Sequence, residues 1–295
     1  MTGVPTPTSG TPASNRVDAH HHFWDPGRAD YPWMTEALAA IRRPFGPDDL
    51  RTLIDRAGID RTVLVQTRSS VEETREFLAT AAETEFVAGV VGWVDLTRSE
   101  VVDALAELRA GPGGDRLVGI RHQVHDEVDA DWLCRPDVRR GIEAVGRAGL
   151  AYDLLVRTRE LPAAVDTVRA LPDVPFVVDH IAKPPITTGE LEPWAERLAA
   201  IAACPNVCCK LSGMLTEADW ERWTIDDLRP YVDVVLEAFG PGRLMFGSDW
   251  PVSLLAADYQ RVVDATRELL GELTPDEQAD VFGRNATRFY ALPPA

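Results

Sequence analysis

Eight short apolar runs recur along this chain, and they limit the folds that it can adopt. The runs are Val17–His22, Thr62–Gln66, Val87–Val94, Leu117–Arg121, Tyr152–Val156, Phe176–His180, Val207–Leu211 and Arg243–Phe246. Segments with helical spacing of apolar residues lie between them: Val71–Thr84, Val101–Ala110, Val138–Ala148, Leu161–Ala170, Trp194–Ala203 and Leu228–Ala238. Apolar strands that alternate with helices are typical of a parallel sheet covered on both faces. Eight such units predict an α/β fold, a single (β/α)8 TIM barrel.

The length of 295 residues suits one such barrel, since barrels of this type commonly take about 250 residues. We expect residues 16–295 to form the barrel. Residues 1–15 are rich in Thr, Pro, Ser and Gly, lack the basic start and apolar centre of a signal peptide, and predict a disordered tail. A doubly wound open sheet is the alternative fold, but no glycine-rich phosphate loop follows the first apolar run.

Charge and hydropathy exclude several classes of partner. With 30 Lys and Arg against 47 Asp and Glu, the net charge is −17. Such an acidic chain disfavours nucleic acids and anionic membranes, because both are bound through Lys and Arg. No uncharged apolar stretch of about 18 residues occurs, so we expect no membrane span. These features predict a cytoplasmic protein with a small-molecule substrate, and they leave room for a homo-oligomer.

The chain has four cysteines, Cys134, Cys204, Cys208 and Cys209. Their small number and uneven spacing do not suit a disulfide framework in a chain of this length. Cys208 and Cys209 are adjacent in a predicted strand and would face opposite sides, which disfavours a shared zinc ion. We expect reduced, mostly buried thiols.

Three of the six histidines stand together at the end of the first apolar run, as His20, His21 and His22. Alternate side chains of a strand face the same side, so His20 and His22 share one face and His21 has the other. His180 and Asp249 close two later runs. Because the active site of a (β/α)8 barrel lies at the carboxyl ends of its strands, we expect these groups to converge.

Imidazoles beside a carboxylate suit two hydrolytic schemes, and the residues leave both open. In the first, His20, His22, His180 and Asp249 hold one divalent metal, with zinc favoured, that polarises a carbonyl and lowers the pKa of bound water. In the second, no metal is present and the histidines donate hydrogen bonds to the carbonyl oxygen. Asp249 takes the proton from water in both schemes and passes it to the leaving group. Both predict hydrolysis of an ester, lactone or amide.

Three cationic residues follow the predicted strands, namely Arg121, Lys183 and Lys210. If they point into the barrel mouth, their charge suits a carboxylate or a polyhydroxylated substrate. The alternative for each is an ordinary salt bridge at a strand end.

Uncharged residues near the strand ends are further candidates for substrate contacts. Gln66 closes the second run, and Trp24, Trp93 and Trp250 would form an apolar wall for a ring-shaped substrate. Tryptophans are equally common in the core. We expect His125 to lie on a loop and assign it no role.

Seven motifs occur in a fixed order along the chain: Asp18–Pro26, Val63–Gln66, Val118–His122, Val178–Pro184, Lys210–Met214, Phe246–Pro251 and Phe282–Tyr290. In these motifs the chain resembles the amidohydrolase superfamily, and within it the amidohydrolase-2 branch of sugar lactonases and 2-pyrone-4,6-dicarboxylate lactonase. The resemblance extends from about residue 16 to the end. No Gly-x-Ser-x-Gly elbow and no His-Glu-x-x-His helix points to another class of hydrolase.

The resemblance implies a reacting centre at the mouth of a (β/α)8 barrel. Strand one would supply His20 and His22, strand six His180, and strand eight Asp249, which would be the general base. Arg121 and His122 would be substrate contacts by the same resemblance.

The resemblance also bears on metal content. Superfamily members with two metals use a lysine or carboxylate at strand four and a histidine at strand five. This chain has Arg121 and His122 at strand four and Asp153 at strand five. The departure disfavours a binuclear centre and leaves one divalent metal or none.

The leading hypothesis is a hydrolase that opens the ring of a sugar aldonolactone or a dicarboxylic lactone. The first alternative is a metal-dependent decarboxylase of an unsaturated or aromatic carboxylic acid, against which the missing histidine at strand five counts. The second is a barrel that only binds a small molecule. It is disfavoured because the chain keeps all four groups, His20, His22, His180 and Asp249.

Overall fold

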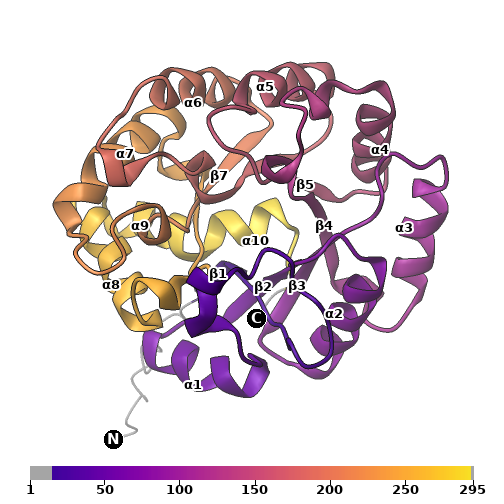
Figure 1. Cartoon of the computed structure of the whole chain (residues 1–295), viewed down its shortest axis with the longest axis horizontal. Helices are drawn as coiled ribbons and strands as arrows, with labels where there is room; N and C mark the ends of the chain where they lie inside the picture. Colours follow the sequence, from indigo (N-terminus) through magenta and orange to yellow (C-terminus); the bar gives the residue numbers. More distant parts are fainter. Residues whose placement is uncertain (1–14, 294–295) are drawn as a thin grey trace, which may run out of the picture.

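All eight apolar runs form strands in the computed structural model, which describes residues 15–293. The strands are β1 (Val17–His21), β2 (Arg61–Val65), β3 (Val87–Gly92), β4 (Leu117–His122), β5 (Ala151–Leu154), β6 (Phe176–Val178), β7 (Val207–Leu211) and β8 (Leu244–Phe246). Neighbouring strands pair in parallel from β1 to β8. The ring closes where Asp249 N donates to His20 O at 2.8 Å, beyond the end of β8. The predicted barrel is confirmed (Figure 1), whereas the predicted tail lies almost wholly outside the described residues.

Helices follow the strands and form the outer layer (Figure 1). They are α1 (Pro47–Ala57), α2 (Val71–Glu83), α3 (Val101–Ala110), α4 (Pro136–Arg147), α5 (Leu161–Ala170), α6 (Trp194–Ala202), α7 (Ile225–Phe239), α8 (Tyr259–Leu269), α9 (Pro275–Ala279) and α10 (Asn285–Phe289). The six predicted helices are present, and α1 and α8 complete the ring. In α1 only Leu50, Ile54 and Ala57 are buried. This narrow stripe explains why apolar spacing alone did not reveal the helix.

Mostly small and β-branched side chains from the strands pack with residues of α10 in one cluster. The cluster comprises Val17, Ala19, Val63, Val65, Ala88, Val91, Ala151, Val177, Met245, Ala286, Tyr290 and Leu292. Its last three members come from α10 and the residues after it. The Asn285 side chain anchors α10 by donating to Leu244 O at 2.6 Å, at the start of β8. The interior is therefore closed at this end, and the site forms at the carboxyl ends.

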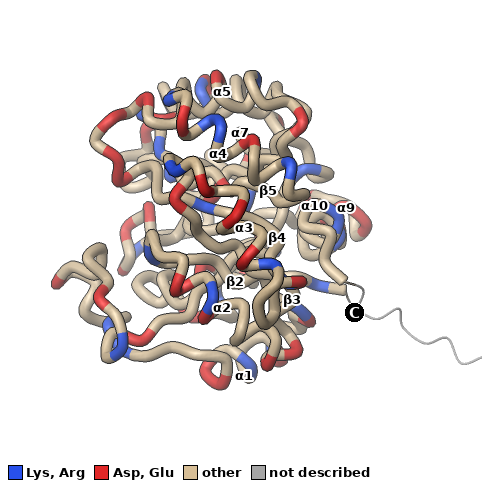
Figure 2. Tube along the Cα trace, turned by 90° about the vertical axis from the view of Figure 1, so that its right-hand side faces the viewer, with Lys and Arg blue, Asp and Glu red and all other residues tan. Residues whose placement is uncertain are grey.

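Figure 2 shows acidic residues along the outer helices and loops, with basic residues among them. Among residues 15–293, no helix is long and apolar enough to cross a membrane. All four cysteines are free, and Cys204 and Cys209 are buried, as expected for reduced thiols.

Candidate active site

A β-bulge in β1 aims two histidines into the barrel. The pairing of β1 with β2 changes register between Asp18 and His21. Val17 and Ala19 belong to the interior cluster, and beyond the bulge His20 and His22 face inward while His21 faces outward, where its Nε2 lies 2.8 Å from Thr62 Oγ1. The predicted division of the three histidines is therefore confirmed. Bulges commonly re-aim side chains beside active sites in this way.

A left-handed turn after β6 carries His180. Four successive residues, His180–Lys183, have φ between 47° and 60°. Residues other than glycine rarely adopt this conformation, which costs roughly 1–2 kcal/mol each. The turn is held where Gly213 approaches His180, because a Cβ on Gly213 would lie 2.6 Å from His180 Nδ1. Strain of this kind at a strand end is typical of a functional site.

Asp249 stands at the centre of the three inward histidines. Its Oδ1 lies 3.3 Å from Nε2 of His22 and 3.8 Å from Nε2 of both His20 and His180. Asp249 itself has a left-handed φ of 55°. All four side chains are at most 5% exposed. The four groups predicted to converge do so.

Burial and neighbouring charges set the ionisation of these groups. Burial alone would raise the pKa of Asp249, but the neighbouring His180 and His22 side chains hold that pKa below its usual value. Burial lowers the pKa of His20 and His180 well below the usual value. The site therefore combines an ionised carboxylate with neutral imidazoles at neutral pH.

Hydrogen bonds on the far side of the rings fix which nitrogen carries the proton. His22 Nδ1 lies 2.7 Å from the Val65 carbonyl oxygen. Since a carbonyl only accepts, Nδ1 donates, and Nε2 is the His22 nitrogen left to offer a lone pair to an ion. His180 Nδ1 lies 2.8 Å from the Ser212 hydroxyl, which can donate, so Nε2 of His180 is free to carry the proton. His22 suits a metal ligand, and His180 suits a hydrogen-bond donor.

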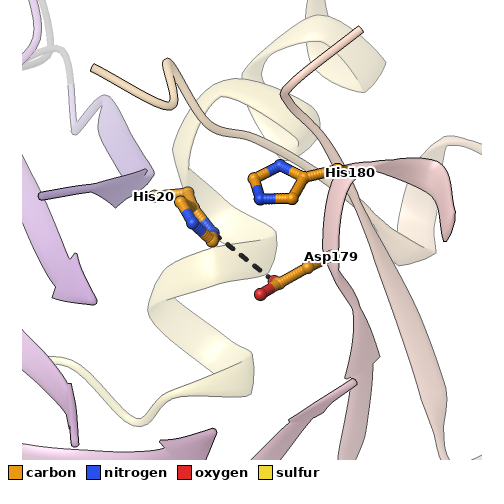
Figure 3. Close-up of side chains that lie close together, drawn as sticks. All are labelled: His20, Asp179 and His180. Atoms are coloured by element: carbon orange, nitrogen blue, oxygen red, sulfur yellow. Dashed lines mark ion pairs between the residues drawn. The ribbon is translucent and has the colours of Figure 1, made fainter. Parts of the chain in front are cut away.

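Asp179 lies directly beneath His20 and His180 (Figure 3). Its Oδ1 is 3.4 Å from His20 Nδ1, and its Oδ2 accepts from Arg121 at 3.0 Å. Arg121 also reaches within 3.2 Å of His20 Nε2. Attraction to the Lys210 ammonium and to His20 outweighs burial and holds the pKa of Asp179 well below its usual value. Asp179 is therefore a buried anion that orients His20 and Arg121.

Lys210 lies below the site and not in the barrel mouth. Its ammonium is 3.1 Å from His20 Nδ1, 3.0 Å from Asp179 and 2.6 Å from Asp153, and the side chain is fully buried. Tyr290, from the residues after α10, donates to the same Asp153 carboxylate at 2.7 Å. Of the two alternatives that the sequence left open for Lys210, the structure shows the salt bridge, because strand alternation turns the side chain into the interior.

The donor atoms can be tested against a single metal ion. Ligand atoms of His20, His22 and Asp249 lie within 4.8 Å of one another, and so do those of His20, Asp179 and His180. The second group already faces Lys210 and Arg121. The first group fits one divalent ion, since His22 presents a lone pair and Asp249 an anionic oxygen. His180 Nε2 lies 3.8 Å from the same Asp249 oxygen, so His180 as a further ligand stays a prediction.

A cavity of about 350 Å³ opens above these residues. Of the predicted groups, His22, His180, Asp249, Arg121 and Lys183 line it, and His20 lies beneath. The Lys183 ammonium is 2.6 Å from Glu217. Arg121 and Lys183, two of the cationic residues considered for the barrel mouth, therefore line the cavity.

Four predicted substrate contacts lie away from this cavity. Gln66 is buried and binds Arg121. Trp250 is core, and Trp24 is buried with its indole N–H donating to Ile41 O. His122 stacks on Trp132 at 4.2 Å and lies 2.8 Å from Glu127. These assignments are corrected: the strand alternation that turns Arg121 inward turns His122 outward.

Several lining residues were not predicted. They are Trp33, Thr67, Gln123, His125, Asp126, Leu155, Arg157 and Val252. All lie on loops after strands, whose course the sequence does not fix. Asp179 was also missed as a member of the site, although it directly follows β6, where polar residues are informative.

The family follows from comparison with known proteins. A sequence model of the amidohydrolase family matches residues 17–292. The chain belongs to the amidohydrolase family. This confirms the resemblance inferred from the motifs, and the histidines and aspartate described above occupy the strand ends of an amidohydrolase barrel.

Similar proteins include two named L-fucono-1,5-lactonases. The one from Burkholderia ambifaria is 43% identical, over 94% of this chain and 96% of its own length. The one from Burkholderia multivorans is 39% identical, with the same coverage. An amidohydrolase crystal structure from Burkholderia multivorans with bound zinc has a TM-score of 0.89 and 36% identity, covering 94% of this chain and 99% of that one.

Proposed function

We propose that this amidohydrolase opens the ring of a sugar 1,5-lactone. The observation that carries the proposal is the Asp249 carboxylate, which faces three histidines at the floor of a cavity. The relatives named L-fucono-1,5-lactonase support the reaction and a 6-deoxyhexonolactone as substrate. The sequence predicted a lactone of the aldonolactone or dicarboxylic class, and this proposal narrows the substrate to a sugar 1,5-lactone.

The reaction begins when Asp249 accepts a proton from a water molecule that attacks the lactone carbonyl carbon. The carbonyl oxygen becomes an oxyanion, and the Nε2–H of His180 can donate to it. When the tetrahedral intermediate collapses, the bond to the ring oxygen breaks. Asp249 then returns the proton to that oxygen, so the products are an alcohol and a carboxylic acid, which ionises.

His20, His22 and Asp249 would hold one zinc ion, which would act as a Lewis acid on the carbonyl when bound. The zinc-bound structure of the Burkholderia multivorans amidohydrolase supports this choice of ion. The Arg121 guanidinium lies 3.2 Å from His20 Nε2, the nitrogen that the ion would use.

The cavity suits a small, polar ring. Its volume of about 350 Å³ lies at the lower end of the range for small-molecule sites. The Trp33, Leu155 and Val252 side chains can pack against ring carbons and a methyl group. Arg121 and Lys183 bring positive charge that favours the developing oxyanion and the carboxylate product.

The test is proton release from aldonolactones and dicarboxylic lactones by the native protein and by Asp249→Asn. We expect turnover by the native protein and a loss of about 10²-fold or more in the variant, the usual contribution of a general base. Asp219→Asn removes an exposed carboxylate instead and should keep full activity. If no lactone is opened, with or without zinc, the proposal fails and carbon dioxide release from unsaturated acids becomes the assay.

A further inference from the structure

One side of the cavity has polar groups that the reaction does not use. His125 and Asp126 belong to the short turn Val124–Asp126 after β4, and Arg157 lies on the loop after β5. The two loops are joined because His125 N donates to Leu155 O at 3.2 Å. All three side chains line the cavity, on a wall formed by neighbouring strands.

Arg157 supplies the positive charge on this wall of the cavity. The other two cations of the cavity are occupied, since Arg121 pairs with Asp179 at 3.0 Å and Lys183 with Glu217 at 2.6 Å. Within the described part of the chain, the Arg157 side chain has no hydrogen bond or ion pair. A guanidinium has five N–H donors in a fixed plane, and they remain available to a ligand.

Asp126 supplies acceptors beside this donor. Asp126 and Arg157 line the same cavity. Burial raises the pKa of Asp126, and the nearby charge of Arg157 opposes that rise. His125 Nε2 lies 3.3 Å from Asp126 Oδ1. Burial and the charges of Lys183 and Arg157 lower the pKa of His125 to about 3. His125 is therefore neutral, and its ring lies against the Asp126 carboxylate.

A carboxylate beside a guanidinium suits a ligand with ring hydroxyls better than a ligand that carries its own carboxylate. Each sugar hydroxyl can donate to Asp126 and accept from Arg157. A ligand carboxylate would be attracted by Arg157 and repelled by Asp126. We propose that Asp126 and Arg157 bind the ring hydroxyls of the lactone and that His125 positions Asp126. This inference rests on the proposed function and names the groups that select a polyhydroxylated lactone.

The experiment compares three lactones with the full chain. L-fucono-1,5-lactone has ring hydroxyls, δ-valerolactone has the same ring without them, and glucaro-1,4-lactone carries a second carboxylate. The quantity is the ratio of kcat/KM for the hydroxylated lactone to that for δ-valerolactone, because this ratio cancels general losses of active enzyme. Variants are Arg157→Met, Arg157→Lys and Asp126→Asn. Arg98→Met is the matched control, an exposed arginine on the loop after β3.

We expect the native protein to prefer the hydroxylated lactone strongly, because a site built to bind hydroxyls rejects an analogue without them. Arg157→Met and Asp126→Asn should each lower the ratio by roughly 10- to 100-fold, mainly through KM. Arg157→Lys should restore part of the ratio, and Arg98→Met should leave it unchanged. The Arg157 side chain is exposed and makes no hydrogen bond or ion pair with the described residues, so its removal should not unfold the protein.

Three outcomes overturn the inference while the proposed function stands. They are a native protein that opens both lactones equally well, variants that keep the native ratio, and a loss in Arg157→Met that is larger for glucaro-1,4-lactone than for the fuconolactone. The last outcome would assign Arg157 to a substrate carboxylate. If the native protein opens no lactone at all, the proposed function and this inference fall together.

Discussion

The Lys210 ammonium lies 3.1 Å from Nδ1 of His20, and both side chains are fully buried. Two cations and two carboxylates surround His20, since Arg121 and Lys210 are matched by Asp153 and Asp179. The balance of charges keeps the network stable inside the barrel, where a single unpaired ion is costly. It also orients the imidazole that faces Asp249.

Removing Lys210 should destabilise the fold severely. Lys210→Met leaves Asp153 and Asp179 without their shared cation, and breaking a buried pair typically costs about 3–5 kcal/mol. Urea unfolding of native and variant protein measures the loss. The double variant Lys210→Met with Asp153→Asn should recover part of it, because one uncompensated charge is gone. An equal loss from Arg222→Met, at an exposed ion pair, would contradict this explanation.

The strands and the reacting groups could be predicted from sequence because both depend on local patterns. Apolar runs mark buried parallel strands, and a histidine or aspartate at the end of such a run marks the open end of the barrel. The partition of His20, His21 and His22 followed from strand alternation. The bulge of β1 could not be predicted, since it arises from pairing with β2.

Substrate contacts could not be predicted because they depend on the course of loops and on which neighbour covers each side chain. Trp24 and Trp250 are adjacent to strand ends, but both are covered by other residues. For Lys210 the sequence left the barrel mouth and a salt bridge open, and its place in β7 turns it toward Asp153. Arg157 gave no signal in the sequence, because nothing there shows that it lacks a partner.

The contact of Gly213 with His180 predicts a specific effect on activity. In Gly213→Ala the new Cβ would lie 2.6 Å from His180 Nδ1, at a residue whose φ is 62°. The imidazole must move, and small misplacements of catalytic groups can cost about 10²-fold in rate. We expect kcat on a lactone to fall by roughly 10- to 100-fold, with about 1–2 kcal/mol of stability lost to the left-handed backbone.

Gly242→Ala is the matched control for this prediction. No atom lies within 4 Å of the Cβ that it would add. Activity and urea stability of this variant should match those of the native protein. Native kcat in Gly213→Ala would show that the His180 ring is not held by this contact.

Asp18 predicts how stability changes with pH. Burial raises the pKa of Asp18 to about 6, although Ser248, His20 and Tyr259 donate to it. Between about pH 4 and 6 the folded state binds a proton that the unfolded state has released. Stability therefore falls as pH rises through this window, by about 3 kcal/mol in total. Above it the carboxyl is ionised in both states, and the effect levels off.

Asp18→Asn should remove that decline, because the amide stays neutral at every pH. Relative to the native protein, the variant should gain stability on going from pH 4 to pH 7, as measured by urea unfolding at both values. Asp264→Asn, which removes an exposed carboxylate from α8, is the control. A constant difference between Asp18→Asn and native protein at the two pH values would show that Asp18 is ionised throughout.

The proposed zinc site predicts a residue-specific effect on thermal stability. An ion that binds only the folded protein raises Tm, by an amount that grows with its concentration above Kd. His22 contributes the lone pair of Nε2 because its Nδ1 is bonded to Val65. We therefore expect zinc to raise the Tm of the native protein and to have little effect on His22→Ala.

His122→Ala is the matched control, since His122 is stacked on Trp132 away from the cavity. Its Tm should be lower than native without metal but should rise by the native increment with zinc. Equal increments in native and His22→Ala protein would place the ion elsewhere.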